Sequence, residues 1–152
     1  MKKNLVRIAA AAALILDRLT KELAPGIPPE GVALIPGVIG LRYAENTGIA
    51  FSLLSGLPRL TGILGLAVIA TGYIWLRKKK IAAFPLTGLG LMAGGAAGNM
   101  LDRLIRGYVP DMIETLFMNF PVFNVADSCL TVGCVLMMIS LLCRPQDWAK
   151  DQ

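Results

Sequence analysis

Four aspartates stand in or beside strongly apolar stretches, and their carboxylates are the groups in this chain best able to do chemistry. They are Asp17, Asp102, Asp111 and Asp127. An aspartate near the centre of a membrane-spanning helix costs roughly 2.5–3.5 kcal/mol on insertion scales. Such a residue is retained where it faces a protein interior and has a partner or a task, so each of the four needs an explanation.

Asp111 and Asp127 form the pair best suited to catalysis. Asp111 lies in the apolar stretch 108–113, and Asp127 is the nearest candidate partner. Two carboxylates in a partly desolvated site do not both ionise readily, so one keeps a proton and the pair can act as acid and base. Aspartic proteases use this arrangement to activate water against a peptide carbonyl. Because a helix N-terminus favours an anion, we hypothesise that Asp127 is the base and Asp111 the acid.

Other catalytic groups are scarce. The chain contains no histidine, which excludes Ser-His-Asp and Cys-His catalysis. Cys129, Cys134 and Cys143 are five and nine residues apart, which matches no zinc motif. We interpret the cysteines as small buried hydrophobic residues, and we expect no metal and no cofactor.

Structural roles for the same polar residues remain open alternatives. Asp17 and Lys21 are an i,i+4 pair that could neutralise each other. Asn99, Asp102 and Arg103 share one helical face, so an Asp102–Arg103 ion pair tied to Asn99 could be a scaffold.

Two further features have structural interpretations. Asn124 could cap a helix that has Asp127 at its third position, as in a capping box. The glycine-rich stretch 94–98 has the small-xxx-small pattern of close helix packing.

The composition predicts the elements that position these residues. Hydrophobic residues make up 55% of the 152 residues and charged residues only 16%, and the mean hydropathy is +0.64. A spanning helix needs about 20 mostly apolar residues, and four segments approach this: residues 4–24, 60–76, 81–101 and 123–143. We therefore predict an all-α membrane protein, a single domain over residues 1–152.

Basic residues predict its orientation. They cluster before residue 8, at 77–80 and near the C-terminus, and the positive-inside rule places these parts in the cytoplasm. Both termini are then cytoplasmic, and segments 25–59 and 104–122 lie outside. Residues 32–43 are rich in β-branched residues broken by Gly and Pro, which predicts short strands in a small extracytoplasmic β-rich cradle.

The predicted spans bring the four aspartates together. At about 1.5 Å per helical residue, Asp17 and Asp102 lie toward the outer ends of their helices and Asp127 near the outer start of its own. Asp111 is in the second outer segment. This convergence at the outer face favours one shared site.

At this point the sequence strongly resembles the lipoprotein signal peptidases, the bacterial type II signal peptidases. Asp17 and Lys21 resemble the family's Asp-x-x-x-Lys block, and residues 46–52, Asn-Thr-Gly-Ile-Ala-Phe-Ser, its Asn-x-Gly-x-Ala-Phe block. Residues 94–103 are similar to its Gly-Asn-x-x-Asp-Arg block, and residues 107–111 and 123–127 to the two blocks that carry its catalytic aspartates. These five blocks occur in the family's order along nearly the whole chain.

The resemblance implies an aspartic endopeptidase. Asp111 and Asp127 would be its catalytic dyad, Asn46, Asn99, Asp102, Arg103 and Asn124 would line or brace the site, and Asp17 and Lys21 would support it. The implied substrate is a prolipoprotein whose cysteine already carries diacylglycerol, cut just before that cysteine in the inner membrane of a bacterium. Membrane lipid would be its surroundings, a monomer is the default, and no nucleic-acid partner is expected.

The sequence departs from the family pattern at three places. Pro110 and Met112 flank Asp111 where an aliphatic residue and Phe are common, and Arg18 stands where a neutral polar residue is usual.

Two other functional classes compete with the peptidase interpretation. A carrier with a proton relay would spread its titrating groups through the membrane depth, and a metal-dependent transferase would need a carboxylate run such as Asp-x-x-Asp.

Overall fold

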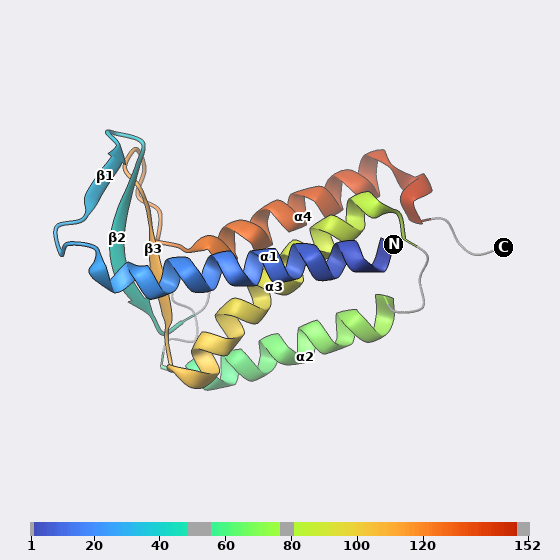
Figure 1. Ribbon diagram of the computed structural model, residues 1–152, viewed down its shortest axis with the longest axis horizontal. Helices are drawn as coiled ribbons and strands as arrows, with labels where there is room; N and C mark the ends of the chain where they lie inside the picture. Colours follow the sequence, from blue (N-terminus) through green and yellow to red (C-terminus); the bar gives the residue numbers. More distant parts are fainter. Residues whose placement is uncertain (1, 49–55, 77–80, 149–152) are drawn as a thin grey trace.

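The protein is a bundle of long helices with a small antiparallel sheet across one end. The computed structural model describes residues 2–48, 56–76 and 81–148. Figure 1 shows the sheet at one end of the bundle, and the beginning of the first helix and the end of the last helix at the other. This arrangement agrees with the prediction that the two basic termini share a side.

The four predicted helices are present, with ends shifted by a few residues. They are α1 (Lys2–Leu23), α2 (Pro58–Leu76), α3 (Ala83–Ile105) and α4 (Val125–Cys143). Short 3-10 turns follow α1 and α4, η1 (Ala24–Gly26) and η3 (Pro145–Trp148). Helix α3 is central, because α1, α2 and α4 all pack against it while α2 has no comparable contact with another element.

Glycines let the helices approach α3 closely, as the sequence predicted. A Cβ at Gly94 would collide with the Ala10 carbonyl oxygen of α1, and one at Gly95 would lie 2.5 Å from the Ala126 carbonyl oxygen of α4. Gly88 and Gly133 similarly face each other across α3 and α4. Small residues therefore set the distance between the helices that carry the polar site.

The sheet contains the two predicted strands and a third that was not predicted. Its order is β1 (Val32–Ile35), β2 (Ile39–Asn46) and β3 (Val109–Thr115), all antiparallel. We expected residues 104–122 to form an outer segment and predicted no strand within it. The strand forms because backbone N–H and C=O groups near a membrane need partners, and the edge of β2 supplies them.

The surface of the bundle is strongly apolar. Within the described ranges, α4 is the helix long and apolar enough to cross a membrane, and residues 58–72 form a shorter apolar helix. Helices α1 and α3 carry charged residues and glycines that lower their hydropathy. The prediction of buried cysteines is wrong for Cys134 and Cys143, which are exposed free thiols, because an apolar side chain on this bundle can face outward.

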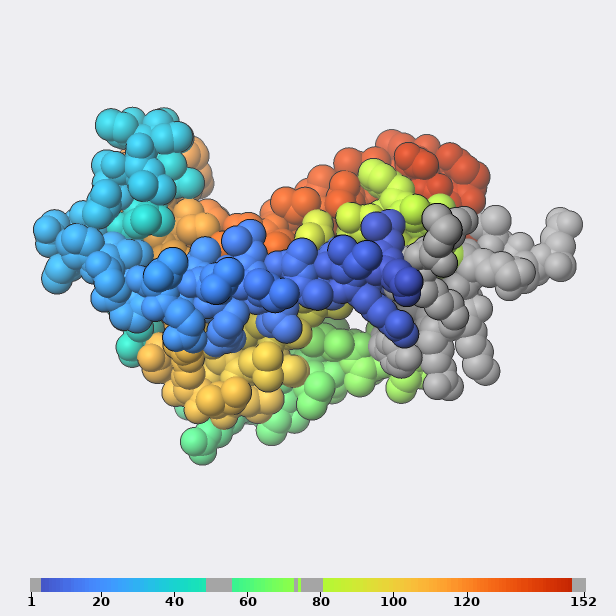
Figure 2. Space-filling model, in the orientation of Figure 1, coloured from blue at the N-terminus to red at the C-terminus, as the bar shows by residue number. Residues whose placement is uncertain are grey.

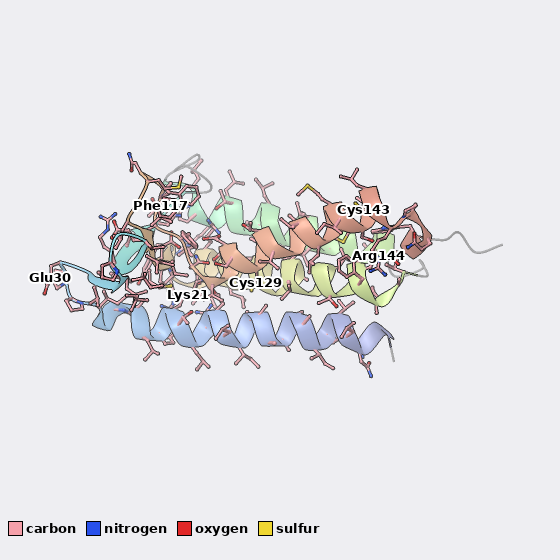
Figure 3. The ribbon with its side chains drawn as sticks, turned by 90° about the horizontal axis from the view of Figure 1, so that it is seen from above. Lys21, Glu30, Phe117, Cys129, Cys143 and Arg144 are labelled. Atoms are coloured by element: carbon pink, nitrogen blue, oxygen red, sulfur yellow. The ribbon has the colours of Figure 1, made fainter. Side chains whose placement is uncertain are left out.

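The surface at the sheet end of the molecule is hollowed. Figure 2 shows the β1–β2 hairpin standing away from the bundle, with a hollow between it and α4 on this face. Side chains in Figure 3 distinguish the two ends, with Lys21 and Glu30 toward the sheet and Cys143 and Arg144 at the opposite end. The polar site lies where the sheet meets the helices.

Candidate active site

Asn124 and Asp127 form a capping box at the start of α4, as one alternative predicted. The Asn124 side-chain oxygen accepts from the Asp127 backbone N–H at 2.9 Å, and the Asn124 backbone N–H donates to Asp127 Oδ2 at 3.2 Å. The positive end of the helix dipole also favours a carboxylate at this position. The cap therefore fixes one aspartate in place.

Asp111 is delivered to the same place by strand β3. Its backbone pairs with Ala44 of β2, and Asp111 as a whole is only 2% exposed. Asn46 Nδ2 donates to Asp111 Oδ2 at 3.0 Å, and Asn124 Nδ2 donates to Asp111 Oδ1 at 2.6 Å. The pKa of Asp111 is raised to about 6, chiefly by burial and also by the nearby Asp127, while the hydrogen bonds from the two amides oppose the rise.

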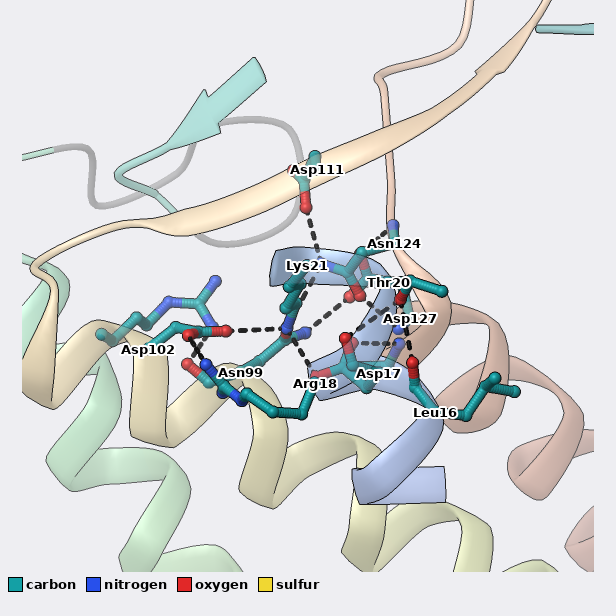
Figure 4. A network of polar contacts seen from close by, with 12 residues as sticks. Leu16, Asp17, Arg18, Thr20, Lys21, Asn99, Asp102, Asp111, Asn124 and Asp127 are labelled. Atoms are coloured by element: carbon teal, nitrogen blue, oxygen red, sulfur yellow. Dashed lines mark hydrogen bonds and ion pairs between the residues drawn. The ribbon is translucent and has the colours of Figure 1, made fainter. Parts of the chain in front are cut away.

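Asn99 of α3 links Asp127 to the interior of the bundle. Its Nδ2 donates to Asp127 Oδ1 at 2.8 Å. Its oxygen accepts from Lys21 Nζ at 2.8 Å and from Asn124 Nδ2 at 3.2 Å. Figure 4 shows these side chains converging from α1, α3, β3 and the start of α4.

A buried ion cluster lies beneath the amides. Lys21 pairs with Asp17 at 2.8 Å, as predicted, and also with Asp102 at 2.8 Å, and all three side chains are fully buried. Asp17 Oδ1 accepts the backbone N–H of Ala126 at 3.0 Å. The cluster therefore ties α1 to both α3 and the first turn of α4.

A match over most of the sequence identifies the family of this chain. A family model described as "Signal peptidase (SPase) II" matches residues 9–143. The chain belongs to the signal peptidase II family. The resemblance inferred from the five sequence blocks is thereby confirmed.

Similar proteins from other bacteria are named lipoprotein signal peptidases. The lipoprotein signal peptidase of Streptococcus pneumoniae is 37% identical over 145 residues, covering 93% of this chain and 94% of the relative. That of Chlorobaculum parvum is 39% identical over 139 residues, covering 82% and 86%. The chain is accordingly a peptidase for the signal peptides of lipoproteins.

Solved structures agree on the fold. One described as a bacterial membrane enzyme has a TM-score of 0.85 and 28% identity, and the match covers 97% of this chain and 93% of that one. A second with the same description has a TM-score of 0.81 and 29% identity, covering 91% and 92%. This signal peptidase II therefore shares its fold with membrane enzymes.

The proposed Asp102–Arg103 ion pair in this signal peptidase II is wrong. Asp102 pairs instead with Lys21, Arg18 at 2.7 Å and Arg106 at 3.4 Å. Arg103 donates from Nη2 to the Gly48 carbonyl at 2.7 Å and from Nη1 to the Asn99 carbonyl at 3.4 Å. Adjacent helical residues point about 100° apart, so Asp102 faces α1 while Arg103 faces the loop after β2.

The roles of Arg18 and Arg106 were not predicted from the sequence. Arg106 also pairs with Glu22, so the ends of α1 and α3 nearest the sheet are joined by a second, more exposed group of charges. The i,i+4 spacing of Asp102 and Arg106 could have indicated one of these contacts. The Arg18–Asp102 contact depends on how α1 and α3 are aligned against each other, and this alignment cannot be read from the sequence.

The site is completed by part of the loop after β2. Gly48 donates its backbone N–H to the Asn46 side-chain oxygen at 3.0 Å. Residues 49–52 of the predicted Asn-x-Gly-x-Ala-Phe block lie outside the described residues. Within the described ranges, His, Cys, Asp and Glu side chains form no group of three or more suited to a metal.

Proposed function

We propose that this peptidase is an aspartic endopeptidase whose dyad is Asp111 and Asp127. Its substrate is a prolipoprotein that already carries diacylglycerol on cysteine, and it cuts the peptide bond just before that cysteine. The reaction needs no metal or cofactor. Asn46, Asn99, Arg103 and Asn124 hold or line the site, while Asp17, Lys21 and Asp102 support it from behind.

One observation carries this proposal: a single side chain, Asn124, is bonded to both aspartates. Its Nδ2 donates to Asp111 at 2.6 Å, and its oxygen accepts from the Asp127 backbone at 2.9 Å. The two carboxylates come from a strand and a helix, so local structure alone does not explain their meeting. Proximity in a largely desolvated site is what an acid–base pair requires.

The proposed mechanism uses the two carboxylates in turn. Ionised Asp127 takes a proton from water as the water oxygen bonds to the scissile carbonyl carbon, and protonated Asp111 donates to the carbonyl oxygen. The tetrahedral intermediate collapses as the C–N bond breaks. Asp127 then gives its proton to the leaving nitrogen, and the proton on Asp111 is restored as the carbonyl reforms.

The surroundings support this division of roles. Asp127 accepts from the Asn99 amide at 2.8 Å and from the Asn124 backbone at 3.2 Å, which favours its charged form. Asp111 is raised in pKa to about 6, chiefly by burial, which favours its proton. We therefore assign the resting proton to Asp111.

The location of the site supports cleavage at the outer surface of a bacterial inner membrane. In the proposed topology all four helices span, both termini are cytoplasmic, and the sheet rests on the outer leaflet. Exposed apolar side chains crowd this end of the molecule: Leu34, Ile35, Phe117, Met118 and Phe120. A diacylglyceryl-modified cysteine is held at the same level by its acyl chains. The monomer suffices, because one chain supplies the whole dyad.

The deciding experiment is cleavage of a diacylglyceryl-modified prolipoprotein in detergent or liposomes. Asp111→Asn and Asp127→Asn should each lower kcat by about 10²–10⁴-fold, the usual contribution of a general acid or base. Glu114→Gln is the matched control, an acid-to-amide change on the same strand at a residue paired with Arg42 at the surface. Thermal unfolding verifies that each variant folds. Substantial turnover by either dyad variant would refute the mechanism.

A further inference from the structure

Every side-chain amide in the site has a fixed orientation. The Asn46 oxygen accepts from the Gly48 backbone at 3.0 Å, so its nitrogen faces Asp111. The Asn124 oxygen accepts from the Asp127 backbone, so its nitrogen faces Asp111 and Asn99. Backbone N–H groups are obligatory donors, and they set these two amides.

Asn99 differs because a charged side chain from another helix orients it. Lys21 Nζ lies 2.8 Å from the Asn99 oxygen, and an ammonium group can only donate. The other contact to this oxygen, from Asn124, is longer at 3.2 Å, and the same nitrogen also serves Asp111 at 2.6 Å. The Asn99 nitrogen must therefore face Asp127.

Lys21 is held so that it cannot turn away. Its ammonium nitrogen donates a hydrogen bond to the Asn99 oxygen at 2.8 Å and forms ion pairs with Asp17 Oδ2 and Asp102 Oδ2, each at 2.8 Å. The residue is 0% exposed, so water offers no alternative partner. Two further cations, Arg18 and Arg106, pair with Asp102, and Asp111 also interacts electrostatically with Lys21.

We propose that Lys21 is a positioning residue of the dyad, which acts by holding the Asn99 amide nitrogen toward Asp127. The inference rests on the proposed function, because it concerns the amide that faces the proposed base, Asp127. A reversed Asn99 would present its oxygen to Asp127 Oδ1, and two acceptors can meet there only if Asp127 carries a proton. Lys21 thus keeps Asp127 able to accept the proton of water.

A double-mutant cycle between Lys21 and Asn99 tests this role. The background is Asp17→Asn, so that Lys21→Met does not leave two buried carboxylates without their shared cation, and Asp102 keeps Arg18 and Arg106. Lys21→Met and Asn99→Ala should each lower kcat by on the order of 100-fold, as expected for misplacing a catalytic group, with KM little changed. Combined, they should cost no more than either alone.

Two further variants separate positioning from a general structural role. Lys21→Gln in the same background restores a donor and should recover at least about tenfold in kcat over Lys21→Met, a difference of roughly 1.4 kcal/mol. Arg18→Gln removes a cation from Asp102 without touching Asn99, and its kcat should match that of the wild type. If Lys21→Met does not fold, a folded Lys21→Gln variant replaces it in the cycle, where its smaller loss should disappear once Asn99 is Ala.

The outcomes are distinguishable. Additive losses from Lys21 and Asn99 variants, or equal kcat for Met and Gln at position 21, overturn the positioning role. Asp111→Asn and Asp127→Asn are assayed in parallel. If either of these keeps substantial activity, the dyad itself falls; if both are inactive while the cycle is additive, only the role of Lys21 falls.

Discussion

At the scale of single residues, Asp111 carries an energetic cost along with its proposed role. It is 2% exposed, and burial raises its pKa from 3.8 to about 6. A carboxyl group whose pKa is higher in the folded than in the unfolded state opposes folding when it ionises. The fold therefore tolerates a group that would be more stable in water, as is typical of acid–base sites.

This cost predicts a pH-dependent stability difference. Below about pH 3 Asp111 is protonated whether the chain is folded or unfolded, so the penalty is absent; the penalty grows between about pH 4 and pH 6 and is complete above that range. Two pKa units correspond to about 3 kcal/mol. The Tm of Asp111→Asn minus that of the wild type should rise by about 6–12 °C between pH 3 and pH 8 in detergent. A difference that stays flat or narrows would contradict the raised pKa.

The sequence predicted the candidate residues better than their partners. Asp111 and Asp127 could be singled out because charged residues in apolar stretches need an explanation, and the Asp17–Lys21 pair and Asn124 cap follow from spacing within one helix. The partners of Asp102 could not be predicted, because Arg18 and Asp102 are 84 residues apart. Such contacts depend on how α1 and α3 pack.

At the scale of elements, the position of α4 depends on a glycine. A Cβ at Gly95 would lie 2.5 Å from the Ala126 carbonyl oxygen and 3.3 Å from Leu130 Cγ. The first turn of α4 carries Asp127, so any shift that relieves this contact also moves the proposed base. Helix packing and site geometry are therefore coupled here.

Gly95→Ala should lower both stability and activity. Overpacking of this kind costs about 1–3 kcal/mol, and kcat should fall because Asp127 moves relative to Asp111. Gly72→Ala in α2 is the matched control, since a Cβ there meets nothing within 4 Å and Ala favours a helix by up to about 1 kcal/mol. Unfolding temperature and prolipoprotein cleavage measure both effects. Equal behaviour of the two variants would show that α4 adjusts without cost.

Helices were predicted more fully than strands. Apolar length identified α1 to α4 within a few residues of their ends, and turn residues in 32–43 indicated β1 and β2. Strand β3 was missed because its pairing with β2 joins residues on either side of α2 and α3, such as Ala44 and Asp111. A strand that depends on such a distant partner leaves little local signal.

At the scale of the whole molecule, the two ends of the bundle have different surroundings in the proposed topology. The sheet and the dyad lie at the outer end, and both chain termini at the inner end. Exposed positions are available at each: Glu30 beside the sheet and Gln146 after α4. These positions allow the orientation to be measured directly.

Single cysteines at these positions should label from opposite sides. In a background with Cys129, Cys134 and Cys143 replaced by Ala, Glu30→Cys should react with a membrane-impermeant maleimide in intact spheroplasts. Gln146→Cys should react only after the membrane is permeabilised. Labelling of Gln146→Cys in intact spheroplasts would reverse or break the proposed orientation.

The bond between Asn46 and Asp111 spans 65 residues, and that between Asp17 and Ala126 spans 109. Contacts at such separations form late. A chain still being synthesised holds no complete set of these groups until the first turn of α4 has been inserted. If the proposed dyad is correct, a nascent chain has no peptidase activity until its assembly is complete.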